Sequence, residues 1–325
     1  NMKKLIIILL LFSIAKISIA QKHNITSAAI ILKQYNSEKD KAIKATKIKE
    51  AKEFIDAAYS NESTSNSAKM WNYRAPIYLQ IALQAPELDE DAILKATEAY
   101  IKCLQKDKKG RVVVRKWTEE EDILSGMVQC GYKLFNEAIE KYNSEEYTKA
   151  LKYYNKIFDI IPLDTEDQLK RGNITKETIL YNSFFASNKM KDNNKSKELL
   201  QQLIDINFNE PAIYIHMSNI YLDEENTEKA LEYLTLGREM FEDDQGLINT
   251  EINLYIQLGR TSELIEKLGE AISLDEENDL LYFNRGTIYD QKGDFANAEK
   301  DYKSSLLINS NSFGANYNLG ALYFN

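Results

Sequence analysis

Histidine, cysteine, proline and glycine are all scarce in this chain of 325 residues, which contains 2 His, 2 Cys, 4 Pro and 12 Gly. Neither His23 nor His216 has a second His or Cys at metal-ligand spacing, and a Ser-His-Asp triad would depend on one of them. No Gly-rich phosphate loop and no nucleophile elbow occurs. The sequence therefore predicts no catalytic residues, no metal site and no cofactor, and we expect a protein that is not an enzyme.

Signals for β-structure are missing as well. The few prolines and glycines leave little material for sheet turns, and no stretch alternates apolar and polar residues over several strands. Apolar residues instead recur at helical spacing along most of the chain. The sequence predicts an all-α protein.

Basic clusters interleaved with aromatic residues are also absent. The nearest is 111–116 (RVVVRK), which we interpret as a connecting segment. The formal net charge is −9 at pH 7, and a surface of that sign repels nucleic acid and anionic lipid headgroups. We expect no nucleic-acid partner.

The first 20 residues have the pattern of a secretory signal peptide. Lys3 and Lys4 precede the apolar run 5–15, and the small residues of 18–20 precede Gln21. We expect cleavage before Gln21 and a periplasmic or secreted mature chain without stable membrane insertion; an uncleaved membrane anchor is the alternative. Cleavage removes three lysines and no acids, which changes the net charge from −9 to −12.

Four tyrosines recur at a constant spacing, namely Tyr221, Tyr255, Tyr289 and Tyr323. A constant period of about 34 residues indicates one supersecondary unit that is copied and stacked into a solenoid. We call this spacing the repeat period. Each copy is too small to bury its own apolar face, so the copies must pack on one another. A stacked array of this kind offers a long surface that can hold another protein.

Residues 279–312 show one unit in full. Two amphipathic stretches flank the segment 291–294, in which Gly293 suits the left-handed position that ends a helix and Asp294 suits a helix cap. The unit is therefore predicted to be a helix–turn–helix hairpin. The apolar residues at helical spacing are Leu281, Tyr282, Ile288 and Tyr289 in the first stretch, and Phe295, Ala298, Tyr302 and Leu306 in the second.

This pattern resembles the tetratricopeptide repeat (TPR), whose hairpins alternate small and bulky residues so that helices can approach closely. The resemblance implies an all-α, right-handed superhelical solenoid of antiparallel helix hairpins. In a weaker copy, Ile252 and Leu264 occupy positions where the family has small residues. The family positions hold Tyr282, Gly286, Tyr289, Ala298, Tyr302 and Ser305, and one good copy upstream holds Tyr214, Ser218, Tyr221, Ala230, Leu234 and Gly237.

The resemblance covers most of the chain after the signal peptide. Residues 21–130 are predicted to form divergent TPR-like hairpins, and residues 131–325 a TPR array. Insertions are expected at 84–91 and 165–176. The last repeat looks truncated, because residues 313–325 resemble a first helix that no second helix follows, and we expect a longer parent protein.

Cys103 and Cys130 are the only cysteines. The repeat register places Cys103 near the end of one second helix and Cys130 near the start of the next first helix. In an exported chain the two could form a disulfide. They could equally be two small buried apolar residues, and the sequence leaves both possibilities open.

The resemblance also implies a binding face, because the first helices of TPR arrays line a concave groove that contacts extended peptides. Asparagine amides both donate and accept hydrogen bonds, as a peptide backbone does, and aromatic rings add apolar area. A second interpretation is that asparagines recur on the first helices only because asparagine is common throughout this chain. The candidate peptide-binding residues are Asn136, Asn182, Asn219, Asn253, Asn284, Asn318, Tyr181 and Phe283.

The sequence therefore predicts an exported, non-catalytic TPR scaffold that binds protein or peptide partners through its concave groove. The alternative is a sensor portion of a membrane receptor or enzyme whose transmembrane or catalytic part lies beyond Asn325.

Overall fold

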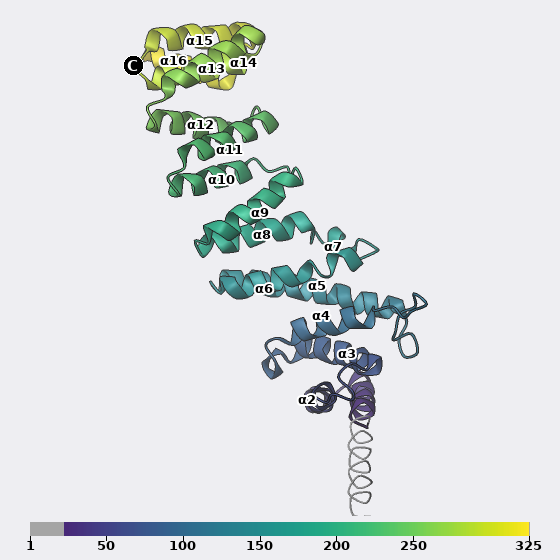
Figure 1. Cartoon of the computed structure of the whole chain (residues 1–325). Coiled ribbons are helices and arrows are strands. Elements are labelled where there is room, and N and C mark those ends of the chain that lie inside the picture. The colour runs from purple at the N-terminus through teal and green to yellow at the C-terminus, as the bar shows by residue number, and fades with distance from the viewer. Residues whose placement is uncertain (1–22, 325) are drawn as a thin grey trace, which may run out of the picture. The chain divides into compact units, whose positions relative to one another are not determined.

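The computed structural model describes residues 23–324, and the regular elements within that range are helices, apart from one isolated bridge between Lys106 and Val112 (Figure 1). Successive helices pair as antiparallel hairpins, which confirms the predicted all-α solenoid of helical repeats. The expected signal peptide lies outside the described residues. Of the helices in this described range, none combines the length and the apolar character needed to cross a bilayer.

The chain divides into two compact units, one ending at Asp192 and the other beginning at Asn193. The first unit contains the predicted early hairpins, since α3 packs on α4, and α5 packs on α6. Its helices are residues 23–37, α2 (Lys41–Tyr59), α3 (Ala68–Gln84), α4 (Ala92–Cys103), α5 (Glu120–Asn143), α6 (Tyr147–Ile157), α7 (Gln168–Arg171) and α8 (Lys176–Lys189), with short 3-10 turns η1 (Pro86–Leu88) and η2 (Ile161–Leu163).

Helix α5 begins well before the position that the repeat register predicts. Three acidic residues, 120–122, occupy its first turn, where they interact favourably with the helix dipole, and Ile123 and Met127 are buried. Cys130 therefore lies inside α5, not near its start, which corrects the expectation from the sequence. Cys103 and Cys130 are both free and buried, and burial raises the pKa of each thiol to about 12. They act as small apolar side chains.

The basic stretch 111–116 belongs to the connection between α4 and α5, as predicted. Val112 and Val114 are buried, whereas Arg111 and Arg115 both approach the carboxylate of Asp107 at 3.1 Å. The two valines thus pack into the core and anchor the loop there. The two arginines form ion pairs with an aspartate of the same loop.

The second unit is a regular series of hairpins. Helix α10 packs on α11, α14 packs on α15, and α15 packs on α16. The bounds are α9 (Asn193–Asp205), α10 (Ala212–Asp223), α11 (Thr227–Met240), α12 (Gln245–Gln257), α13 (Thr261–Leu274), α14 (Asp279–Gln291), α15 (Phe295–Ile308) and α16 (Phe313–Phe324).

The turn inside each hairpin keeps the same backbone conformation at the repeat period. Gly293 has φ +77°, Gly259 has φ +66° and Glu225 has φ +59°. Asp294 then caps α15 by accepting a hydrogen bond from the backbone N–H of Asn297 at 3.3 Å. The predicted hairpin turn is confirmed, and at Glu225 the tertiary structure imposes a left-handed residue where glycine would be less strained.

The small residues of the repeat lie where neighbouring helices touch, as predicted. Ala230 and Ala298 are fully buried. A Cβ atom added to Gly237 would lie 2.8 Å from the Cβ of Tyr214, and one added to Gly286 would lie 3.0 Å from the ring of Tyr302. Because protein interiors are close-packed, these positions exclude larger side chains.

Candidate functional site

The candidate binding residues are distributed over both units. Asn136 on α5 and Tyr181 and Asn182 on α8 belong to the unit that ends at Asp192. The remaining five lie on the first helices of the unit that begins at Asn193: Asn219, Asn253, Phe283, Asn284 and Asn318.

In the first unit, Asn136 is exposed, whereas Tyr181 and Asn182 are half-buried. The ring centroid of Tyr181 lies 4.7 Å from that of Phe185, so Tyr181 belongs to an aromatic cluster on α8. Helix α8 packs on α6, and the Asn182 side chain lies near Tyr154. Burial raises the pKa of Tyr154 to about 12, and the nearby Asn182 amide partly opposes that shift. Asn182 is thus engaged in packing between hairpins.

The second unit repeats this arrangement at its far end. Asn318 Nδ2 donates a hydrogen bond to Tyr302 Oη at 3.2 Å, from α16 to the preceding second helix α15. Asn284, one repeat earlier, is only 3% exposed. The row that contains Asn182, Asn284 and Asn318 therefore faces the preceding hairpin, and its amides contribute to packing more than to an open surface.

The neighbouring positions of the first helices are more open. Asn219 on α10 and Asn253 on α12 are exposed and stand one repeat period apart, and Asn249 is exposed one turn before Asn253. Phe283 is half-buried on α14, and Tyr317 on α16 is 68% exposed. We define these five residues as the first-helix face. It carries amides and aromatic rings, and no charge.

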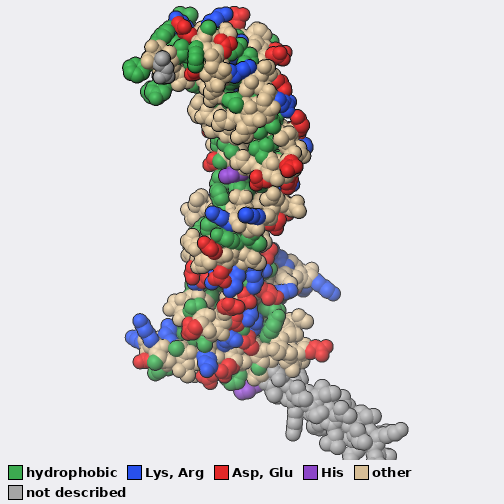
Figure 2. All heavy atoms as spheres, turned by 90° about the vertical axis from the view of Figure 1, so that its left-hand side faces the viewer, with side chains coloured by type: hydrophobic (Ala, Val, Ile, Leu, Met, Phe, Trp, Pro, Cys, Tyr) green, Lys and Arg blue, Asp and Glu red, His purple; other side chains and the backbone are tan. Residues whose placement is uncertain are grey.

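The aromatic part of this face is held in place by the following hairpin. A Cβ atom added to Gly314 would lie 2.7 Å from the ring of Phe283, so the glycine makes room for that ring. Tyr317 stacks on Phe313 at a centroid distance of 6.2 Å. On the side drawn in Figure 2, hydrophobic side chains gather at the level of α16, where Phe313 and Phe324 are 83% and 92% exposed.

His216 on α10 is half-buried and occupies the repeat position that Asn182, Asn284 and Asn318 occupy on other first helices. Burial lowers its pKa, and the nearby carboxylate of Glu210 only partly opposes that shift. A histidine whose pKa lies below its ordinary value is neutral at pH 7. His216 therefore adds no charge beside the first-helix face.

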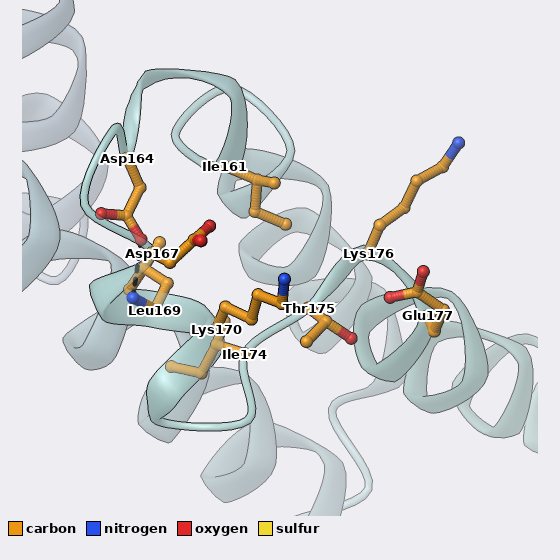
Figure 3. A pocket seen from close by; sticks show the side chains of 9 residues that line it. All are labelled: Ile161, Asp164, Asp167, Leu169, Lys170, Ile174, Thr175, Lys176 and Glu177. Carbon is orange, nitrogen blue, oxygen red and sulfur yellow. Dashed lines mark hydrogen bonds between the residues drawn. The ribbon is translucent and has the colours of Figure 1, made fainter.

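Sequence reasoning missed two hollows on the surface. One, of about 250 Å³, lies in the insertion 161–177 of the first unit (Figure 3). The Lys170 side chain crosses it toward Thr175, whereas Lys176 points away. Asp164, at its edge, accepts a hydrogen bond from the backbone N–H of Leu169 at 2.7 Å. The interrupted repeat period revealed the insertion, but no sequence signal revealed its hollow.

The second hollow, of about 510 Å³, lies between α11, α12 and α13. Arg260 pairs with two of its four glutamates, because it approaches Glu228 at 2.7 Å and Glu263 at 2.8 Å. Lys267 donates a hydrogen bond to Tyr255 Oη at 3.0 Å. Within residues 23–324 no three His, Cys, Asp or Glu side chains are grouped to hold a metal ion.

Comparison with known proteins supports the repeat assignment. Residues 280–312, the hairpin of α14 and α15, match the family model for the tetratricopeptide repeat. No curated protein matches the chain. The predicted resemblance is confirmed for this hairpin.

Solved structures that resemble the chain are helical-repeat proteins. One is YrrB, a TPR protein with an unusual peptide-binding site (15% identity over 57% of this chain and 90% of that chain, TM-score 0.32). Another is a TPR protein from Parabacteroides merdae (15%, 92% and 100%, TM-score 0.30). A third is pilF of Pseudomonas aeruginosa (14%, 93% and 97%, TM-score 0.28). At these identities and scores the likeness concerns the fold alone.

Proposed function

We propose that this chain is a non-catalytic scaffold whose first-helix face binds an extended, uncharged peptide segment of a partner protein. The observation that carries the proposal is the exposed set of Asn219, Asn249 and Asn253 beside Phe283 and Tyr317, on first helices that recur at the repeat period. An amide can pair with a peptide N–H and with a peptide C=O. The rings supply apolar contact area with little loss of side-chain entropy.

The lack of charge on this face selects the kind of peptide. Of the carboxylates that flank it, Asp223 is exposed at the end of α10, and Asp290 accepts a hydrogen bond from Tyr302 Oη at 3.2 Å. No lysine or arginine belongs to the face, so an acidic tail has no partner there. A mostly neutral segment satisfies the amides without leaving a charge unpaired.

Replacing Phe283 by alanine is expected to weaken peptide binding by about 2 kcal/mol, because aromatic anchors dominate such interfaces. The double change Asn219→Ala and Asn253→Ala is expected to weaken binding less. Binding should depend little on salt, because screening acts on charges. The probes are neutral peptides selected from a display library against the full chain, titrated by fluorescence anisotropy, with the melting of each variant recorded alongside.

Two matched controls sharpen the experiment. Phe295→Ala removes a phenylalanine that is 57% exposed at the start of a second helix, and Asn311→Ala removes an exposed amide in the loop before α16. Both variants should bind as tightly as the wild type. An equal loss of peptide affinity in the controls and in the variants of the first-helix face would contradict the proposal.

We further propose that the protein is exported and that its mature chain begins at Gln21. The support is the pattern of residues 1–20, with two lysines, an apolar run and small residues before the expected cleavage position. Intact-mass measurement of protein from the extracellular or periplasmic fraction is expected to give the mass of residues from Gln21 onward. A mature species that retains residues 5–15 and sediments with membranes would contradict it.

A further inference from the structure

Three second helices of the unit that begins at Asn193 end in an exposed apolar residue. Met240 is the last residue of α11, Leu274 of α13 and Ile308 of α15, and each follows the previous one by one repeat period. Their side chains are 48%, 89% and 40% exposed. Leu274 is far more exposed than packing in a hairpin would leave it. Repetition at the repeat period shows that this exposure belongs to the repeat and is not a single irregularity.

The loops that follow α11 and α13 are acidic. Glu242 and Asp243 follow α11, and Asp275, Glu276 and Glu277 follow α13; all five are exposed. No lysine or arginine occurs in 239–259, 268–284 or 304–324. We call the three apolar residues together with these five carboxylates the acidic edge.

Of the nearest guanidinium groups, Arg238 attracts Glu242 and Asp243, but neither it nor Arg285 forms a salt bridge with the acidic edge. Arg238 is 16% exposed, donates a hydrogen bond to the backbone carbonyl of Glu242, and lies 3.6 Å from Glu251. Arg285 forms a two-point ion pair with Asp301. The exposed carboxylates of the loop after α13, Asp275, Glu276 and Glu277, therefore keep their full negative charge available to a partner, whereas Arg238 offsets part of the charge of Glu242 and Asp243.

Hydrogen bonds between successive repeats make the acidic edge continuous. Asn278, in the loop after α13, donates from Nδ2 to Glu242 Oε1 in the loop after α11, at 3.2 Å. Asn309, in the loop after α15, donates to Asp279 Oδ2 at the start of α14, at 3.0 Å. The three loops thus adjoin one another along one side of the unit, at the hairpin ends opposite the turns at Glu225, Gly259 and Gly293.

We propose that the acidic edge binds a basic amphipathic segment of a partner protein. The apolar residues of that segment would cover Met240, Leu274 and Ile308, and its lysines or arginines would pair with the carboxylates of the two loops. Charge selects this occupant. A second copy of the chain, with its net charge of −9, would bring like charges together, and nucleic acid or anionic lipid would be repelled.

This site is separate from the first-helix face. The acidic edge lies at the C-terminal ends of second helices, whereas the first-helix face lies on α10, α12, α14 and α16. The two surfaces also differ in the salt dependence that they predict, since binding at the acidic edge weakens as salt screens exposed charges. Phe283→Ala should leave binding at the acidic edge unchanged, so the two proposals can fail independently.

The test uses a labelled synthetic peptide in which leucines at helical spacing form one face and lysines the other, titrated against the full chain by fluorescence anisotropy. A second peptide replaces every lysine by glutamate and keeps the leucines. The lysine peptide is expected to bind and the glutamate peptide is not. Leu274→Ser with Ile308→Ser, and separately Glu276→Lys with Glu277→Lys, should each weaken binding about tenfold, the scale of about 1.4 kcal/mol in affinity.

Two control variants make changes of the same kind elsewhere in the unit. Phe295→Ser removes an exposed apolar side chain at the other end of α15, and Asp223→Lys with Glu225→Lys makes the same charge change at the opposite ends of the hairpins. Retained affinity in both controls supports the acidic edge. An equal loss in Asp223→Lys with Glu225→Lys means that net charge alone attracts the peptide, and an equal loss in Phe295→Ser means that any exposed apolar side chain contributes. Either result overturns the proposal, as does equal binding of the glutamate peptide.

Discussion

Replacing Arg285 by methionine is expected to lower the free energy of unfolding of the hairpin α14–α15 by about 3 kcal/mol, because it leaves a buried carboxylate without its counter-charge. Asp301 is 3% exposed, and its two carboxylate oxygens accept hydrogen bonds from Arg285 Nε at 2.7 Å and Nη2 at 2.9 Å. Amide hydrogen exchange resolved over α14, α15 and α16 is the measurement, since stability in a repeat array is a sum over neighbouring units.

Two further variants isolate the buried charge as the cause. Arg285→Met combined with Asp301→Asn removes both charges and should recover most of the lost protection. Arg260→Met removes an arginine of the same unit whose ion pairs with Glu228 and Glu263 lie at the surface, where such pairs contribute little, so its effect should be much smaller. Equal losses for Arg285→Met and Arg260→Met would show that Asp301 does not depend on its partner.

Replacing Arg74 by methionine is expected to lower the free energy of unfolding of the first unit by about 2 kcal/mol, from the loss of a charge-assisted hydrogen bond and of cation–π contacts. Arg74 is 4% exposed, and its Nη1 donates to Asp56 Oδ1 at 2.7 Å. Its guanidinium carbon lies 4.1 Å from the ring centroid of Tyr59 and 4.3 Å from that of Tyr78. The substitution therefore removes a partly buried ion pair, in which the Asp56 side chain is 32% exposed, and two cation–π contacts together. Denaturant unfolding followed by circular dichroism and hydrogen exchange of α2 and α3 measures the loss.

The neighbours of Arg74 explain why a lysine cannot replace it. Burial opposes ionisation of Asp56, but hydrogen bonds from Lys52, Tyr78 and Arg74 hold its pKa below the ordinary value. Arg74→Lys keeps the charge and loses the planar group between the two rings, so an intermediate loss is expected. Arg111→Met is the surface control, because that arginine is 52% exposed. Wild-type stability of Arg74→Lys would show that charge alone suffices.

Local signals in the sequence determined the hairpins of the second unit. Gly293 and Asp294 lie where the turn and the cap form, because a left-handed residue and a capping carboxylate act within a few residues of the chain. The repeat period likewise located the small residues that touch neighbouring helices. The repeat period also places Asn249, Phe283 and Tyr317 at equivalent positions of successive first helices, and equivalent positions share a face.

Tertiary packing decided where α5 begins. It also decided which asparagines of the first helices are buried and which are exposed. Asn284 and Asn253 belong to adjacent rows of the same first helices, yet one is buried and the other exposed. Which row is covered depends on the hairpin packed against it, and that contact joins residues far apart in the chain.

What the sequence by itself determined was the period, the helical class and the hairpin turns, because these follow from side chains a few residues apart. Only the tertiary structure decided which polar groups are buried and which apolar groups are exposed. Arg285 and Asp301 are polar residues in an amphipathic pattern, yet they pair in the interior, whereas Leu274 is apolar and 89% exposed. The physical reason is that the burial of a residue depends on the surfaces packed around it. Those surfaces belong to neighbouring hairpins, which come together only when the array has stacked.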